Sequence, residues 1–294
     1  MILLLGGATA SGKTEVAIAL ARAFDAEIVG ADSRQIYREM PIGTAMPTPE
    51  QRAETPHHMI GFLDPRERYS AARYAVDAMA AIDDIRGRGK RVIVAGGTGF
   101  YVRALCGAVT LAPQYDPVLR ARLALEARTH SSEVLHAWLA VRDPVRAASV
   151  RASDAYRVLR ALEVALATRI APERRDGVPT LSSRGIAFRY AVLDVAAAEI
   201  DARIEFRIDA MLASGFVEEA ERIGAAAAAA NAVGYPLALA YLRGWSTRGE
   251  LRAALVRATR QYARRQRTWF RGEDADFVSR DALAEYAREK LGWT

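Results

Sequence analysis

The chain has 294 residues, of which 51% are hydrophobic and 26% charged, enough for one large or two modest globular cores. A single cysteine excludes an internal disulfide, four histidines without cysteine companions make no zinc pattern, and no apolar run approaches the ~20 residues of a membrane-spanning helix. The net charge of +6 favours a polyanionic partner.

The first predicted element is a buried strand over Ile2–Leu5, with no basic leader in front of it. We therefore expect a cytoplasmic protein that contacts no membrane. The sequence GATASGKT follows at once, and a helix is predicted over Thr14–Phe24. The G-x-x-x-x-G-K-T spacing is typical of a phosphate-binding loop, whose backbone N–H groups converge on anionic oxygens at the positive end of a helix.

The loop also has the side chains that bind phosphate. One of the chain's three lysines, Lys13, falls where the loop needs a lysine to neutralise phosphate oxygens, and Thr14 is in place to ligate Mg²⁺. The alternative is a glycine-rich turn that binds no ligand. The residues expected to bind phosphate are Gly7, Ala8, Thr9, Ala10, Ser11, Gly12, Lys13 and Thr14.

Two more strands are predicted in the N-terminal part, over Glu27–Ala31 and Arg91–Ala95, with an alanine-rich helix over Tyr69–Arg86 before the second of them. This alternation indicates right-handed βαβ units and a parallel sheet, with ligands at the carboxyl ends of the strands. The first strand leads into DSRQIY and the second into GGTGFY. Both loops therefore lie at the same edge as the phosphate-binding loop.

Each of these loops offers a polar side chain with two interpretations. A nucleotide hydrolase needs an acidic residue for Mg²⁺ after a strand, and Asp32 and Asp194 are both candidates. Asp32 alternatively caps its own turn. Thr98 is either the N-cap of the next helix or a hydroxyl directed into the crevice beside Asp32.

From Asp116 to about Gly177 the pattern predicts helices alone, before a break rich in Gly, Pro and Ser over 176–185. The segment Phe188–Val195 returns to the sheet, and the chain from Ala197 onward is predicted to be helical. We predict an α/β fold with a P-loop-type parallel sheet flanked by helices. Its core takes residues 1–115 and 186–294, and a helical insertion takes 116–185.

The segment RATRQYARRQRTWFRG carries an arginine stripe, defined as Arg257, Arg260, Arg264, Arg267 and Arg271. Steps of 3, 4, 3 and 4 place these guanidinium groups along one helical face, interleaved with aromatic residues. A solvated helix face is the ordinary interpretation of such a run. The segment contains no Asp or Glu, however, and an unrelieved row of like charges destabilises its own helix, which favours a polyanionic partner.

Taken in order, the motifs resemble those of the tRNA dimethylallyltransferases over nearly the whole chain. The segments DSRQIY and RRQRTWF are far more specific than the phosphate-binding loop. The others are PHHMIGFLDP, YSAARY, VAGGTGFYVRAL, DAYRVLRALEV, MLASGF and NAVGY. The resemblance implies a kinase-like P-loop fold that does not hydrolyse ATP. It implies transfer of a dimethylallyl group from dimethylallyl diphosphate to the exocyclic N6 amine of the adenine 3′ of the anticodon, in tRNAs that read codons beginning with U.

The resemblance also assigns roles to residues. The loop, with Mg²⁺ bound through Thr14, holds the donor's diphosphate together with Arg203 and Arg207. Lys13, Asp32 and Thr98 are implied to be catalytic, with Asp32 accepting the proton of the amine. The expected partners of a monomer are dimethylallyl diphosphate and the tRNA anticodon stem-loop. The implied tRNA-binding residues are Asp32, Ser33, Arg34, Gln35, Thr98, Arg120, Arg157, Arg160, Arg264, Arg265, Gln266, Arg267, Trp269 and Arg271.

Three alternatives stay open at this level. A P-loop kinase of a small metabolite predicts ATP turnover with Mg²⁺ and leaves the arginine stripe unexplained. An RNA-binding P-loop protein without prenyl chemistry predicts tRNA binding that survives Asp32→Ala, with no catalytic step to lose. An isopentenyltransferase of free adenine nucleotides shares the catalytic loops, but the helical insertion and the arginine stripe favour tRNA.

Overall fold

The computed structural model describes residues 1–109, 111, 117–167 and 178–294. They divide into a larger unit, Met1–Ala108 with Pro179–Thr294, and a smaller unit, Val109–Val178. The predicted boundary at Asp116 and the start of the predicted break at Asp176 lie outside the described residues. In the part of the chain that is described, no helix is both long and apolar enough to span a bilayer.

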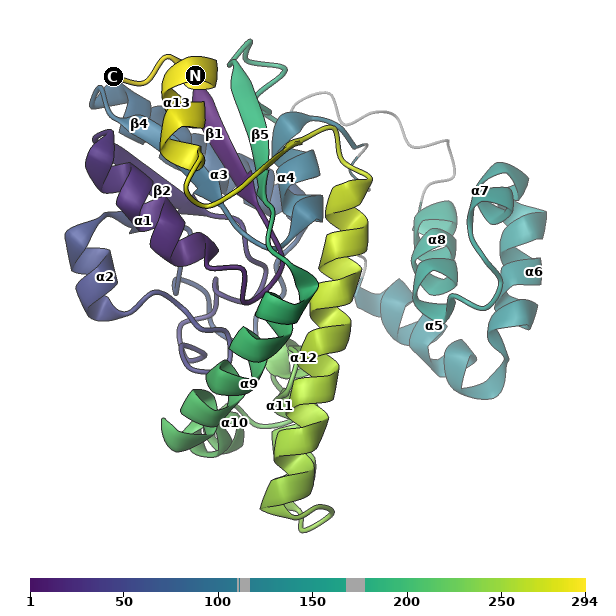
Figure 1. Ribbon diagram of the computed structural model, residues 1–294. Coiled ribbons are helices and arrows are strands. Elements are labelled where there is room, and N and C mark those ends of the chain that lie inside the picture. Colours follow the sequence, from purple (N-terminus) through teal and green to yellow (C-terminus); the bar gives the residue numbers. More distant parts are fainter. Residues whose placement is uncertain (110, 112–116, 168–177) are drawn as a thin grey trace. The chain divides into compact units, whose positions relative to one another are not determined.

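The larger unit is built on a parallel sheet, which confirms the predicted α/β fold (Figure 1). Among the described residues the strand order is β3-β2-β4-β1-β5-β6. The prediction that the chain is helical after Ala197 is wrong at β6, where three residues pair with β5 at the edge of the sheet. Neither β6 nor the two-residue β3 is long enough to show an alternating pattern. The strands are β1 (Ile2–Gly6), β2 (Ala26–Gly30), β3 (His57–His58), β4 (Arg91–Ala95), β5 (Phe188–Leu193) and β6 (Asp276–Val278).

Both faces of the sheet are covered by helices, which explains why β1 is apolar throughout and β4 is apolar from Val92 on. Side chains alternate along β1, so Leu3 and Leu5 pack under α1 (Lys13–Ala23) and α13 (Leu283–Leu291). Ile2 and Leu4 pack on the other face, under α3 (Ala71–Gly87) and α4 (Gly99–Cys106). This double burial fixes the ends of β1, β2 and β4, and with them the loops that follow.

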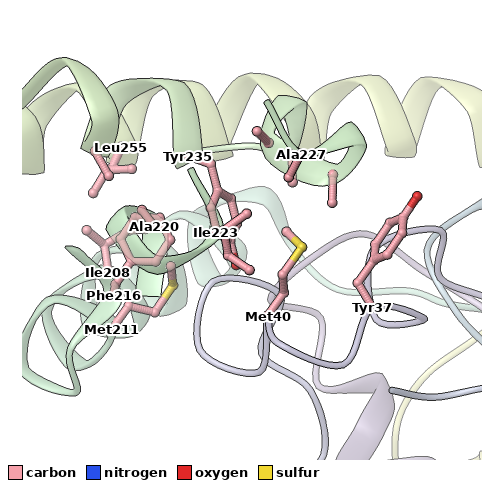
Figure 2. Close-up of a cluster of buried hydrophobic side chains, with 14 of the residues drawn as sticks. Tyr37, Met40, Ile208, Met211, Phe216, Ala220, Ile223, Ala227, Tyr235 and Leu255 are labelled. Atoms are coloured by element: carbon pink, nitrogen blue, oxygen red, sulfur yellow. The ribbon is translucent and has the colours of Figure 1, made fainter. Parts of the chain in front are cut away.

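A helical subdomain of the larger unit packs against the loop that follows β2. Figure 2 shows Tyr37 and Met40 of that loop facing Tyr235 and Ile223 in a shared apolar core. Buried Glu219 joins the two parts, because its carboxylate accepts hydrogen bonds from Ile42 N at 2.9 Å and Gly43 N at 2.8 Å. The remaining elements of this unit are α2 (Pro49–Glu54), α9 (Ala197–Ala213), α10 (Phe216–Ile223), the 3₁₀ turn η1 (Ala228–Asn231), α11 (Tyr235–Leu242) and α12 (Arg248–Arg271).

Helix α12 carries the arginine stripe and begins at a capping box. Thr247 Oγ1 accepts a hydrogen bond from Glu250 N, and Glu250 Oε2 accepts one from Thr247 N. The helix then runs for 24 residues beside α9 (Figure 1). Its length brings its C-terminal half to the loops that follow β1 and β4, where Gln266 contacts both.

The described part of the smaller unit consists of helices around a compact apolar core. Leu123, Leu135, Leu139 and Leu162 are buried in it. Asp143 starts one of the helices by accepting a hydrogen bond from Arg146 N at 2.9 Å. The helices are α5 (Pro117–Thr129), α6 (Ser132–Arg142), α7 (Pro144–Ser149) and α8 (Ala155–Ala167).

Candidate active site

The predicted phosphate-binding loop connects β1 to α1 and wraps around one end of a cavity. Gly12, the residue before α1, has φ 85°, a left-handed conformation that favours glycine. The cavity has a volume of about 740 Å³ and lies at the carboxyl ends of β1, β2 and β4. Its polar lining includes Thr9, Ser11, Lys13, Thr14, Asp32, Gln35, Arg203, Arg207 and Gln266.

Two cations face this cavity from within the protein. Lys13 Nζ donates to Ala8 O at 2.7 Å, and burial lowers the pKa of Lys13 to about 8, with Asp32 opposing that shift and Arg207 adding to it. Burial also lowers the pKa of Arg207, again opposed by Asp32. Arg207 Nη1 donates to Thr9 Oγ1 at 3.2 Å, while its buried Nε has no hydrogen-bond partner among the described residues. An anion in the cavity would therefore gain from both side chains.

Two further arginines lie at the loop's last glycine. A Cβ added at Gly12 would lie 3.1 Å from Arg203 Nη1 and 3.5 Å from Arg280 Nη2. Arg203 pairs with Glu199 at 2.6 Å, and Arg280 pairs with Glu15 of α1. Arg280 could not be predicted from the sequence, because it follows the unpredicted strand β6 and belongs to no motif.

Asp32 follows β2, caps its own turn as one sequence interpretation predicts, and also lines the cavity. Its Oδ1 accepts hydrogen bonds from Arg34 N at 2.8 Å and Gln35 N at 3.4 Å, which caps the turn. Its Oδ2 lies toward Gly97 on the cavity side, 3.7 Å from where a Cβ on that glycine would be. One oxygen thus fixes the carboxylate, and the other is directed at the loop after β4. Asp194, the second acidic candidate, is exposed after β5 and does not line the cavity.

Thr98 connects the loops that follow β2 and β4. It precedes α4, but its side chain makes no capping hydrogen bond to that helix. Instead its Oγ1 accepts from Ser33 N at 2.9 Å and lies 3.3 Å from Ser33 Oγ. The hydroxyl therefore contacts the residue after Asp32, and Thr98 is not among the residues that line the cavity.

A second hollow, of about 60 Å³, lies beside the main cavity and shares Thr9, Asp32, Thr44 and Arg207 with it. Tyr262 of α12 lines this hollow, and burial together with the charge of Asp32 raises the pKa of Tyr262 to about 12. Arg34 lines it as well. Asp32 consequently borders two recesses, one of which contains the phosphate-binding loop.

One member of the arginine stripe has acidic partners. The expectation that it has none is wrong at Arg260, which pairs with Glu205 at 2.5 Å and Asp201 at 3.5 Å from α9. Both acidic residues belong to α9, so they cannot be identified from the sequence of the arginine-rich segment alone. Arg257, Arg264, Arg265 and Arg271 are exposed.

Two predicted tRNA-binding residues of α12 point inward instead. Gln266 is 7% exposed and bonds to Thr9 N and Gly97 O. Trp269 packs on Gly99 so closely that a Cβ there would lie 2.0 Å from its Nε1, and Arg103 lies over its ring at 4.8 Å. Gly97 and Gly99 of GGTGFY therefore allow α12 to approach this closely.

Three predicted tRNA-binding arginines belong to the smaller unit. Arg157 pairs with Asp154 at 3.3 Å. Arg120 and Arg160 both pair with the buried Glu163, at 3.6 and 2.8 Å. Ion pairs within the smaller unit therefore hold these three arginines in position.

Within the described ranges, no group of three or more His, Cys, Asp or Glu residues could hold a metal ion. The metal ligand expected from the sequence, Thr14, lines the cavity next to Lys13. Mg²⁺ commonly takes one or two protein ligands and completes its shell with phosphate oxygens and water, and this donor set fits such a site.

The family model described as IPP transferase matches residues 35–273 of the chain. A tRNA dimethylallyltransferase of Anaeromyxobacter dehalogenans (strain 2CP-C) is 46% identical over 276 residues, which cover 92% of each protein. The tRNA dimethylallyltransferase of Stenotrophomonas maltophilia (strain R551-3) is 45% identical over 281 residues, covering 91% of this chain and 88% of that protein.

Solved structures agree with these relatives. The full-length tRNA isopentenylpyrophosphate transferase of Bacillus halodurans superposes with a TM-score of 0.70 at 30% identity, over 99% of this chain and 95% of that one. A eukaryotic dimethylallyltransferase acting on tRNA gives a TM-score of 0.71 at 23% identity, over 99% of this chain and 76% of that one, and so shares the fold.

Proposed function

The chain belongs to the IPP transferase family, and we propose that it is a tRNA dimethylallyltransferase. It transfers a dimethylallyl group from dimethylallyl diphosphate to the exocyclic N6 amine of the adenine 3′ of the anticodon, in tRNAs that read codons beginning with U. Diphosphate leaves as the C–O bond of the donor breaks and the N–C bond forms. The observation that carries the proposal is the cavity that joins the phosphate-binding loop to Asp32.

The donor's diphosphate binds at the loop. The loop, the first residues of α1, Lys13 and Arg207 all line this cavity, and the buried Nε of Arg207 has no hydrogen-bond partner among the described residues. Negative charge builds on the diphosphate as the C–O bond breaks, so these groups bind the transition state more strongly than the substrate. Thr14 would hold Mg²⁺, which supplies further neutralisation of the leaving group.

Asp32 acts on the acceptor. The adenine amine is a poor nucleophile because its lone pair is delocalised into the ring. A carboxylate that accepts a hydrogen bond from the amine orients it and takes its proton as the N–C bond forms. Asp32 lies between the main cavity and the second hollow. This position supports the role, because the allylic donor and the adenine can approach Asp32 from different sides. Thr98 supports the loop that carries Asp32, because its Oγ1 accepts a hydrogen bond from Ser33 N.

The tRNA is bound by arginines. The target base must leave its stack to reach Asp32. In the smaller unit, Arg120, Arg157 and Arg160 are proposed to contact the anticodon stem-loop. In the larger unit, the surface proposed to contact it consists of the exposed arginines of α12 together with Arg34 and Gln35. Gln266 and Trp269 are left out of this surface, because both side chains are engaged with the protein's own loops.

An incubation of the protein with Mg²⁺, unmodified tRNA and radiolabelled dimethylallyl diphosphate tests the proposal, with AMP and ATP in parallel reactions. We expect label in tRNA and no consumption of ATP. Label on AMP alone would indicate the nucleotide-acting enzymes, and ATP turnover without label transfer would indicate a kinase.

A further inference from the structure

Gln266 joins the two loops that hold the proposed substrates. Its Oε1 accepts a hydrogen bond from Thr9 N at 2.7 Å, and its Nε2 donates to Gly97 O at 2.9 Å. A backbone N–H needs an acceptor and a carbonyl needs a donor, so these bonds also fix which way the amide faces. With the side chain 7% exposed, both ends of the amide are used inside the protein.

On the donor side, Gln266 fixes the peptide group that holds Lys13. The N–H of Thr9 and the carbonyl of Ala8 belong to one planar peptide and point in opposite directions. Ala8 O accepts from Lys13 Nζ at 2.7 Å and from Ser11 N at 3.2 Å. Holding Thr9 N therefore directs Ala8 O toward Lys13.

On the acceptor side, Gln266 contacts the residue before Thr98. Gly97 makes this contact possible, because a Cβ there would lie 2.4 Å from Gln266 Nε2. Thr98 Oγ1 in turn accepts from Ser33 N, beside Asp32. A continuous set of bonds thus runs from Lys13 through Gln266 to the residues next to Asp32.

We propose that Gln266 is a positioning residue, which holds the donor loop and Lys13 in register with the acceptor loop that carries Thr98. The inference rests on the proposed function. It gives Gln266 a role in alignment in place of the tRNA contact expected from its motif.

The test compares Gln266→Met, which keeps the length of the side chain and removes both polar ends, with Gln261→Met, an exposed glutamine of the same helix. Binding of inorganic pyrophosphate, binding of tRNA and kcat at saturating substrates are measured for each. In Gln266→Met we expect pyrophosphate affinity and kcat to fall by about tenfold or more, and tRNA affinity to stay within about twofold. Gln261→Met should match the wild type in all three.

Gln266→Glu provides a signature that a purely structural role would lack. As a carboxylate it cannot donate to Gly97 O, but when protonated it restores both hydrogen bonds. The ratio of its kcat to that of the wild type should therefore rise as the pH is lowered from 8 to 6. If Gln266→Met fails to fold, two other measurements test the positioning role. One is this ratio of kcat values. The other is pyrophosphate binding by Gly97→Ala, in which the added Cβ displaces Gln266 Nε2.

Unchanged pyrophosphate affinity and kcat in Gln266→Met would overturn the positioning role, as would a loss of tRNA affinity alone. A wild-type protein that binds no pyrophosphate would overturn the proposed function as well.

Discussion

At the scale of single residues, the candidate site contains two buried cations, Lys13 and Arg207, and one nearby carboxylate, Asp32. The charge of Arg207 adds to the burial that lowers the pKa of Lys13. The charge of Asp32 opposes the lowering of the pKa in both cations. The same cations are poised to take up an anion, because each has lost hydration without gaining a full set of partners.

Replacing Asp32 by Asn keeps the shape and the turn but removes the base. We expect turnover to fall by roughly 10²-fold or more while tRNA affinity stays within a few-fold. Single-turnover kinetics and filter binding measure the two quantities. Asp194→Asn is the matched control, since Asp194 also follows a strand but lies outside the cavity. Normal turnover in Asp32→Asn would rule out the assignment of the base.

The lowered pKa of Lys13 predicts a pH dependence of donor binding. Below a pH of about 8 the ammonium is charged and attracts the diphosphate, and above it the charge is lost, so pyrophosphate affinity should fall as the pH rises from 7 to 9.5. Titration calorimetry across this range measures it. Lys13→Arg keeps its charge throughout, so any remaining fall in that variant belongs to pyrophosphate itself. Parallel curves for the two proteins would contradict the prediction.

At the scale of elements, α12 has two different faces. Its buried face ties the loops after β1 and β4 together through Gln266 and Trp269, while its exposed face carries Arg264, Arg265 and Arg271. The helical period read from the sequence predicted that the arginines share a face. It did not show which of them meet acids on α9, because that depends on tertiary packing.

Replacing Arg264 and Arg271 together by Ala should weaken tRNA binding and reduce its dependence on salt. Each lost phosphate contact lowers the slope of log K against log salt by about 0.7–0.9. Binding measured between 50 and 200 mM salt gives this slope. Replacing Arg288 and Lys290 together by Ala removes the same charge from α13 and should leave the slope unchanged. Equal slopes for the first double variant and the wild type would remove Arg264 and Arg271 from the tRNA surface.

At the scale of the whole molecule, the parallel sheet could be predicted because β1, β2, β4 and β5 are long enough to read as apolar runs. The edge strands β3 and β6 could not, since they are short and half exposed. The G-x-x-x-x-G-K-T spacing behind a predicted strand was enough to predict a loop between β1 and α1 at the carboxyl ends of the strands, and phosphate binding there stays a prediction. Arg280 and the structural use of Gln266 were not predictable, because both depend on contacts between segments more than 160 residues apart.

The division into two units predicts a separable donor site. Leu181 N donates a hydrogen bond to Leu105 O at 2.8 Å. The two segments of the larger unit that are joined through the smaller unit in the sequence therefore lie close together. Replacing Val109–Val178 by a short glycine-rich linker should leave pyrophosphate affinity within about twofold and lower tRNA affinity by about tenfold or more. Unchanged tRNA affinity would show that the smaller unit takes no part in binding tRNA.

The proposed role of the loop is an alkyl transfer to one adenine of tRNA. Mass spectrometry of nucleosides and fragments from tRNA treated with the protein, Mg²⁺ and dimethylallyl diphosphate tests this role. We expect N6-dimethylallyl adenosine at the position 3′ of the anticodon, and none when that adenosine is replaced by guanosine. Unmodified adenosine there, or alkylation elsewhere, would contradict it.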